Sequence, residues 1–171
     1  LGNDIDGEAA DDQSGESVSI SADGNTVAIG ANLNDGNGNW SGHVRIYNYN
    51  GSSWIQLGND IDGEAANDRS GEAVSLSDDG NTVAIGAHGN DGNGSASGHV
   101  RIYNYNGSSW NQIGNDIDGE VAGGRSGYSV SLSSDGNTVA IGAKDNDGNG
   151  AYSGHVRIYN WDGTSWYQFG Y

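Results

Sequence analysis

One stretch of the sequence, Ser41–Trp54, occurs three times and constrains what the whole chain can fold into. It returns unchanged at Ser97–Trp110, and it returns with three substitutions at Ser153–Trp166. Within it, Val44 and Ile46 alternate with polar or aromatic residues, the period of two that is typical of a β-strand. An Asn-Gly pair follows, and both residues tolerate the positive φ angles of a tight hairpin turn. The stretch therefore predicts a strand, a turn and a returning strand, three times over.

The repeat has a period of 56 residues, and its first two copies are identical at 46 of 56 positions. A fixed period of this length indicates a repeat architecture, in which each unit buries its faces against its neighbours. We therefore expect one structural unit of three repeats, with boundaries at residues 1–56, 57–112 and 113–171. The last range includes the start of a fourth copy.

Each copy is expected to contain four antiparallel strands. In the first copy they cover residues 16–21, 26–31, 43–50 and 54–61. An Asp-Gly pair joins the first two strands, and this pair is among the strongest short signals for a hairpin. No segment has the 3.6-residue period of a helix, so the chain should be all-β.

The two faces of the expected sheet differ in side-chain size. One face carries Val18, Ile20, Val27 and Ile29, and the other carries much smaller residues. A sheet of this kind can stack closely on a copy of itself, as the blades of a β-propeller do. Tight hairpins disfavour a parallel β-solenoid, and strict repetition disfavours a β-sandwich. The sequence thus predicts three tandem four-stranded blades of a β-propeller.

Three segments of the first copy, at residues 14–20, 23–31 and 41–47, resemble the FG-GAP repeat, and the resemblance extends over all three copies. That repeat builds the β-propeller heads of integrin α subunits and of many bacterial and algal surface proteins. The resemblance implies propeller blades, an extracellular or cell-surface location and a role in adhesion. Two departures stand out. Ser14 replaces the family's Phe, and the Asp-rich calcium loop between the first two strands is shortened to residues 22–25. So short a turn cannot supply the six to eight oxygen ligands that calcium prefers.

Composition excludes several classes of function. The chain has 171 residues, no Cys and a formal net charge of −17. Without Cys it forms neither a disulfide nor a zinc–thiolate site. Its charge repels phosphates, which argues against nucleic acid as a partner. No apolar run is long enough to insert into a membrane. Because the chain has no Met and no recognisable signal peptide, we expect it to be a mature or excised part of a longer protein.

Acidic residues are concentrated in the two long loops of each copy, which an up-and-down sheet places at the same end. These loops hold 16 of the 23 acidic residues, so we expect an acidic rim. Two interpretations stay open: ordinary β-turns, for which Asn, Asp and Gly are equally typical, and a calcium site. The better candidates for calcium ligands open each copy: Asp4, Asp6, Glu8, Asp60, Asp62, Glu64, Asp116, Asp118 and Glu120.

Three histidines, His43, His99 and His155, recur once per copy, each two residues before an arginine. We interpret them as structural residues that balance acidic neighbours across a blade contact. The recurring Trp54 and its equivalents are expected to pack between blades. No nucleophile–base pair, phosphate-binding loop or cofactor motif is present, so we do not expect an enzyme.

Four Asn-X-Ser sequons could accept N-glycans in a eukaryotic secreted protein, although Asn-Gly-Ser is equally a good turn. They lie at Asn39, Asn50, Asn93 and Asn106.

Three blades do not close a ring, because propellers typically have four to eight. The end blades would then expose apolar faces. We expect the chain to pair with itself in a closed ring or a fibre, or to belong to a longer array. The favoured function is a non-enzymatic extracellular structural or adhesion module, whose acidic rim meets cations, glycans or protein partners. The alternative is a lectin-like or enzymatic propeller with a site at its central channel.

Overall fold

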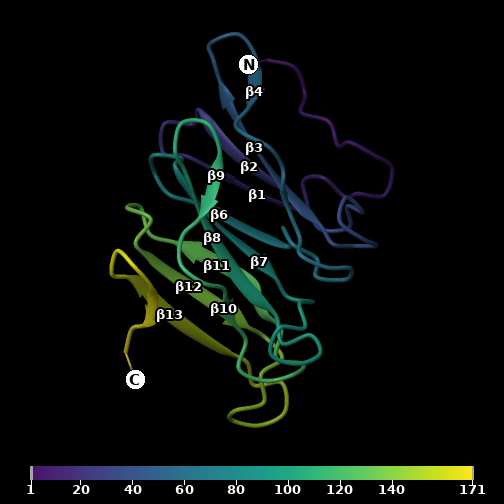
Figure 1. Cartoon of the computed structure of the whole chain (residues 1–171), viewed down its shortest axis with the longest axis vertical. Coiled ribbons are helices and arrows are strands. Elements are labelled where there is room, and N and C mark those ends of the chain that lie inside the picture. The colour runs from purple at the N-terminus through teal and green to yellow at the C-terminus, as the bar shows by residue number, and fades with distance from the viewer. Residues whose placement is uncertain (1, 171) are drawn as a thin grey trace.

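The computed structural model describes residues 2–170 and contains three antiparallel sheets, which we call blades 1, 2 and 3 (Figure 1). Blade 1 is formed by β1 (Ser17–Ile20), β2 (Thr26–Ala31), β3 (His43–Tyr49), β4 (Trp54–Gln56) and β5 (Ile61–Asp62). Blade 2 is formed by β6 (Ala73–Leu76), β7 (Thr82–Ala87), β8 (His99–Tyr105), β9 (Trp110–Gln112) and β10 (Ile117–Asp118). Blade 3 is formed by β11 (Ser126–Leu132), β12 (Thr138–Ala143), β13 (His155–Trp161) and β14 (Trp166–Gln168).

Each blade is an up-and-down meander, in which sequence neighbours are hydrogen-bonded in the order expected for a propeller blade. The prediction of an all-β chain with three four-stranded antiparallel sheets is confirmed. The second strand begins and ends where the sequence places it, at residues 26–31, and the other strands differ by one or two residues at their ends. Among the described residues, no helix is long and apolar enough to cross a membrane.

The fourth strand differs from the prediction of one continuous strand over residues 54–61. Its first part pairs Gln56 with Tyr47, and its second part, β5, pairs Ile61 with Val44 on the same edge of β3. Two residues of β3 therefore face four residues of the fourth strand, and the chain forms a bulge around Gly58, whose φ is +71°. Only Gly adopts this φ without strain.

The bulge also shifts the blade boundaries relative to the sequence repeats. Because β5 lies in the second copy of the repeat but pairs with β3, the three sheets span residues 17–62, 73–118 and 126–168. Blades 1 and 2 thus use the first residues of the following copy as part of their edge strand.

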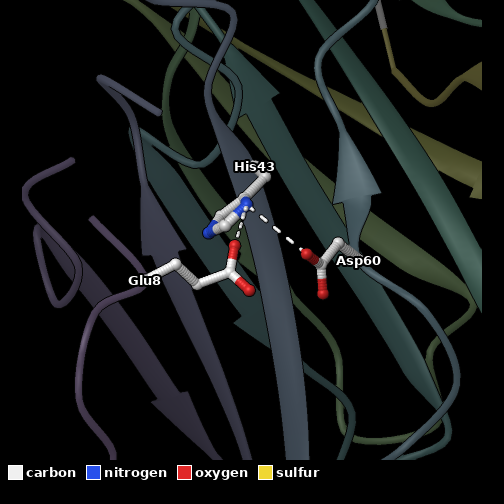
Figure 2. Close-up of side chains that lie close together, drawn as sticks. All are labelled: Glu8, His43 and Asp60. Carbon is white, nitrogen blue, oxygen red and sulfur yellow. Dashed lines mark ion pairs between the residues drawn. The ribbon is translucent and has the colours of Figure 1, made fainter. Parts of the chain in front are cut away.

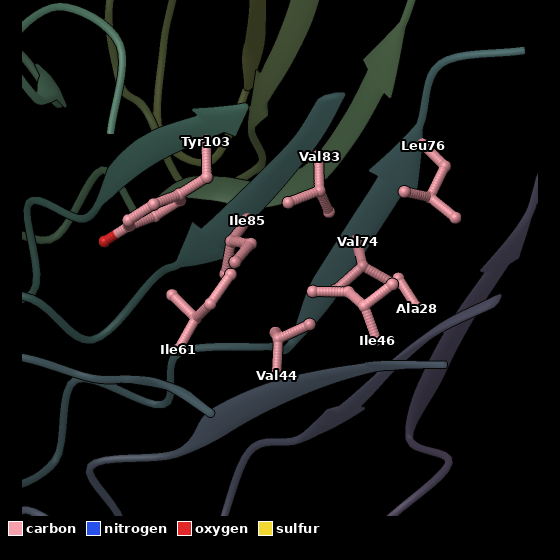
Figure 3. Close-up of a cluster of buried hydrophobic side chains, with 9 residues drawn as sticks. All are labelled: Ala28, Val44, Ile46, Ile61, Val74, Leu76, Val83, Ile85 and Tyr103. Atoms are coloured by element: carbon pink, nitrogen blue, oxygen red, sulfur yellow. The ribbon is translucent and has the colours of Figure 1, made fainter. Parts of the chain in front are cut away.

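Neighbouring blades stack face to face, and the hydrophobic core lies between them (Figure 3). From blade 1, Ala28, Val44 and Ile46 form the smaller face and are at most 1% exposed. From blade 2, larger residues such as Val83 and Ile85 face them. The second junction repeats this arrangement, with Val100 and Ile102 of blade 2 against blade 3. The asymmetry of side-chain size that the sequence predicts is what lets the blades interlock.

Candidate functional site

A cluster of one histidine and two carboxylates lies on blade 1, on the side of the sheet that faces away from blade 2 (Figure 2). His43 opens β3, Glu8 belongs to the segment that precedes blade 1, and Asp60 lies in the bulge after β4. The Nδ1 atom of His43 is 3.8 Å from Oε2 of Glu8 and 3.8 Å from Oδ2 of Asp60. The imidazole is 2% exposed, whereas the carboxylates are 45% and 28% exposed. The cluster therefore joins a buried nitrogen to two solvent-accessible acids.

The bulge explains how Asp60 reaches this position. A continuous strand would not place the extra residues beside His43, because each residue would face one partner on β3. With the bulge, the Asp60 carboxylate turns toward the histidine and accepts a hydrogen bond of 2.5 Å from Nε2 of Gln56. Asp60 is consequently positioned by a hydrogen bond from its own strand, and its carboxylate lies near His43 of β3.

An arginine fixes the second acid of the cluster. Nη1 of Arg45 is 3.4 Å from Oε1 of Glu8, and its Nη2 donates a 2.8 Å hydrogen bond to the carbonyl oxygen of Asp6. The guanidinium also lies 5.7 Å from the centre of the Tyr47 ring. Because Arg45 contacts Oε1, the other oxygen of Glu8 is the one that faces His43.

The same cluster recurs at the junction of blades 1 and 2, where Glu64 follows β5 of blade 1 and His99 and Asp116 belong to blade 2. Nδ1 of His99 is again 3.8 Å from both acids, and the imidazole is 1% exposed. Burial lowers the pKa of His99 below its ordinary value, and the nearby guanidinium of Arg101 lowers it further. The imidazole is therefore neutral near pH 7, and its Nε2 atom has no hydrogen-bond partner among the described residues.

The third copy forms only part of the cluster. His155 lies 3.8 Å from Glu120, and Nη1 of Arg157 lies 3.2 Å from the same carboxylate. In the part of the chain that the structure describes, no second acid joins this pair.

The structure thus groups the predicted calcium ligands differently from the sequence. Among residues 2–170, Asp4, Asp6 and Glu8 do not form one cluster; instead Glu8 of one copy meets Asp60 of the next. The remaining predicted acids take other positions: the backbone oxygens of Asp62 and Asp118 accept hydrogen bonds from arginines. Whether calcium binds stays a prediction. The histidine, interpreted from sequence as a structural partner of acids, lies at the centre of each cluster.

Several acids of the expected rim accept hydrogen bonds from other residues of the loops. The carboxylate of Asp12 is 5% exposed and accepts a 2.9 Å hydrogen bond from Asn34, and Asp68 does the same with Asn90. Asp35 accepts a 2.8 Å hydrogen bond from the backbone N–H of Trp40. These acids fit the interpretation of the loops as turns.

The four predicted glycosylation residues are all exposed. The side-chain oxygens of Asn50 and Asn106 accept hydrogen bonds from the following serines and so close the hairpin turns. Nδ2 of Asn93, the atom that a glycan would modify, donates a 2.8 Å hydrogen bond to the carbonyl of Gly119. Asn39 lies in the loop before β3. Glycosylation stays a prediction for all four.

A shallow groove beside the fourth strand recurs once per copy. In blade 1 and its junction with blade 2, it is lined by Asp60, Tyr103, Ser109 and Trp110, among others. Equivalent grooves lie along residues 2–6 and 114–118. The indole N–H of Trp110 donates a 2.8 Å hydrogen bond to the carbonyl of Leu57, which confirms that the recurring tryptophan packs between blades.

The two outer faces of the stack are apolar and exposed. On blade 1, Val18 is 64% and Ile20 is 59% exposed. On blade 3, Val156 is 66% and Ile158 is 40% exposed. The equivalent residues at the internal junctions are buried or half-buried, so these faces are the largest departure from the repeating pattern.

Comparisons with known proteins agree with this architecture. The FG-GAP repeat family matches residues 5–47 and 61–103. Among solved structures, the chain is similar to the β-propeller domain of the Trilobed protease from Pyrococcus furiosus, whose description reports an open velcro topology. That similarity has a TM-score of 0.50 and 10% sequence identity, and it covers 88% of this chain and 41% of that chain. A search of curated proteins finds no match. At this identity the structural likeness shows the fold alone.

Proposed function

The chain belongs to the FG-GAP repeat family, and from this premise we propose that it is a non-enzymatic structural and adhesion module that associates with further copies of itself through its outer blade faces. Its acidic loops then remain free for cations, glycans or protein partners. FG-GAP repeats are typical of extracellular and surface proteins, which supports a location outside the cell or on its surface.

One observation carries the proposal: side chains that are buried at the internal junctions are exposed at the ends of the stack. Val156 is 66% exposed, whereas its equivalents Val44 and Val100 are 0% exposed. Ile20 is 59% exposed, whereas its equivalent Leu76 is 7% exposed. Burying an aliphatic side chain of this size contributes roughly 1.5–3 kcal/mol. The face of blade 3 therefore matches the face of blade 1 on a second copy, as each internal blade matches its neighbour.

The backbone at the free edge of blade 1 already has the conformation that the equivalent edges of blades 2 and 3 adopt when they bond to a preceding blade. Arg69 and Arg125, whose N–H groups bond to the preceding blade, have φ angles of 55° and 53°. Gln13 occupies the equivalent position on blade 1 and has a φ of 56°, although within residues 2–170 its N–H bonds to no preceding blade. A positive φ is unusual for a non-Gly residue. The edge is thus preorganised for a blade on its open side.

Charge supports the same head-to-tail contact. At the first junction, Asn32 donates a 2.7 Å hydrogen bond to the carboxylate of Glu72. At the second junction, the equivalent residues are His88 and Tyr128, whose rings lie 5.4 Å apart. At the contact between two chains, the equivalent residues are Lys144 of one copy and Glu16 of the other, which are oppositely charged. Both are exposed in the single chain.

Sedimentation velocity over a range of concentrations tests the proposal. We expect the wild-type chain to associate and the variant Val156→Lys to remain monomeric, because a lysine would be buried against an apolar face. Val121→Lys is the matched control, since Val121 is 47% exposed in a loop away from both faces. A wild-type chain that is monomeric at every concentration would overturn the proposal and would leave further repeats of a longer chain as the occupants of the faces.

Electron microscopy distinguishes the forms that association can take. Two chains joined at both faces would give a closed ring of six blades, and three chains would give nine. A contact that does not close would give a fibre.

The repeated grooves favour one second candidate, a lectin-like module. Each groove combines a partly exposed tryptophan with an acid and hydroxyl groups, the set that stacks on and hydrogen-bonds to sugars. Glycan-array binding that is lost in Ser109→Trp, which fills the groove of the second blade, would support this candidate. Unchanged binding in that variant would argue against the groove as the sugar site.

A further inference from the structure

Two clusters of one histidine and two carboxylates have a geometry that hydrogen bonding does not explain. At 3.8 Å, the Nδ1 atom of His43 is too far from either carboxylate for a hydrogen bond, which requires about 3.2 Å or less. The imidazole is nevertheless 2% exposed and directed at both acids (Figure 2). We propose that each complete cluster binds one divalent cation: Glu8, His43 and Asp60 on the outer side of blade 1, and Glu64, His99 and Asp116 at the junction of blades 1 and 2.

The spacing of the ligand atoms fits a cation. Metal bonds to imidazole nitrogen and carboxylate oxygen are about 2.0–2.2 Å long, and two such bonds at a tetrahedral angle span about 3.4 Å. The three ligand atoms of each cluster lie within 4.8 Å of one another. Glu8 and Asp60 are 45% and 28% exposed, so their carboxylates have room to move. A small movement toward the histidine would bring all three ligand atoms within bonding distance of one cation.

The ligand set identifies the class of cation. Calcium takes six to eight oxygen ligands, whereas an imidazole with two carboxylates is typical of zinc and other first-row divalent metals. Water would complete the coordination, since both carboxylates are open to solvent. The site therefore differs from the calcium interpretation that the sequence left open, both in its ligands and in its metal.

The arginine beside each cluster does not occupy the cation position. Arg45 contacts Oε1 of Glu8, and the opposite oxygen, Oε2, faces His43. The second cluster has the same division, with Arg101 on Oε1 of Glu64 and His99 near Oε2. The guanidinium thus orients the glutamate through Oε1, the oxygen that does not face the histidine.

The imidazole nitrogen that faces the acids makes no hydrogen bond to them. His99 is 1% exposed, and its Nδ1 lies 3.8 Å from both acids. Buried polar groups normally have a partner, so a buried imidazole nitrogen that faces two carboxylates at this distance indicates a missing ligand between them. The binding form is the neutral imidazole.

The inference deepens the cation-binding part of the proposed function and is independent of chain association, because both complete clusters lie within one chain. Among residues 2–170, no second acid is grouped with Glu120 and His155. A monomeric chain is therefore expected to bind two cations, one at each complete cluster.

The test is titration of the chelator-treated chain with Zn²⁺ by calorimetry and with Co²⁺ by visible absorption. We expect two sites per chain, and the double variant His43→Gln/His99→Gln should weaken both by at least about tenfold. His88→Gln is the matched control, because His88 is also buried but lies beside a single acid, Glu72, at 3.7 Å. Its binding should equal that of the wild type.

A second double variant distinguishes the loss of a metal ligand from misfolding of the chain. Asp60→Asn/Asp116→Asn changes partly exposed acids and should also remove binding. Sites that persist unchanged in both double variants would be adventitious surface binding and would overturn the inference. Sedimentation of the same samples keeps the two proposals apart: association without metal binding would contradict only the cation site, and metal binding without association would contradict only the self-association.

Discussion

Gly30 of blade 1 and Gly71 of blade 2 approach so closely that no side chain fits between them. A Cβ atom added to Gly30 would lie 2.9 Å from the carbonyl carbon of Gly71, and closer still to its oxygen. The same relationship joins Gly86 of blade 2 to Gly127 of blade 3. Backbone-to-backbone contact at each junction therefore depends on glycine for space.

This contact predicts different outcomes for two equivalent glycines. Gly86→Ala should lower the free energy of unfolding by at least about 2 kcal/mol, because the obstacle is the backbone of Gly127. Gly142→Ala should have a much smaller effect on the single chain, since its new Cβ would meet only the hydroxyl of Ser129, which can rotate away. Urea denaturation measures both.

The second variant also reports on association. Gly142 lies on the outer face of blade 3, so an added methyl group there should block a docking blade and weaken association by at least about tenfold, the equivalent of about 1.4 kcal/mol. If Gly142→Ala associated over the same concentration range as the wild type, this result would contradict the head-to-tail contact.

Lys144 and Glu16 provide a charge test of the same contact. Lys144→Glu or Glu16→Lys alone should weaken association, because each places like charges opposite each other. The double variant should recover most of the loss. The effect should be modest, about 0.2–1 kcal/mol for the restored pair, and should decrease at high salt. Sedimentation equilibrium measures the four dissociation constants, and single and double variants that weaken association equally would exclude this pairing.

The sequence predicts the blades well because their signals are local. The alternation of Val44 and Ile46 with polar residues predicts β3, and the Asp-Gly and Asn-Gly pairs predict both hairpins. The bulge at Gly58 was missed because residues 54–61 were interpreted as one strand. The run Gly58-Asn59-Asp60 carried the signal, since a glycine inside a strand often marks a bulge.

The cluster could not be predicted in the same way, because its members come from segments that meet only in the folded chain. Glu8 and Asp60 are far apart in sequence, and they belong to two copies of one motif. The sequence offered ligands from a single loop as the better calcium candidates, whereas the structure joins loops of successive copies through His43. The recurring histidines were noticed, but the sequence does not show that the bulge brings Asp60 beside His43.

Trp110 of blade 2 forms a hydrogen bond to the bulge of blade 1. Its indole N–H donates a 2.8 Å hydrogen bond to the carbonyl of Leu57, directly before Gly58. Trp110→Phe keeps most of the packing and removes the hydrogen bond, so the chain should lose about 1 kcal/mol of stability. Trp40→Phe is the control, because its indole N–H makes no hydrogen bond within residues 2–170 and its ring is 43% exposed. Equal losses in chemical denaturation would show that the hydrogen bond contributes nothing.

Asp162 predicts an acid dependence that the two equivalent hairpins, at Asn50 and Asn106, lack. It replaces the turn residues Asn50 and Asn106, and hydrogen bonds from Thr164 and the backbone N–H of Ser165 lower its pKa from 3.8 to about 2. Because the folded pKa lies below the unfolded value, ionised Asp162 stabilises the fold above about pH 4, and this contribution is lost as the pH falls toward about 2.

Asp162→Asn should therefore leave stability at pH 7 nearly unchanged, since asparagine closes the same turn at the two equivalent positions. Between about pH 4 and pH 2, the variant should lose less stability than the wild type, because one acid-sensitive group is gone. The reverse variant, Asn50→Asp, should gain the same acid sensitivity in blade 1. Thermal unfolding across this pH range compares the three proteins, and a carboxyl NMR titration of Asp162 with a midpoint near 3.9 would contradict the assignment.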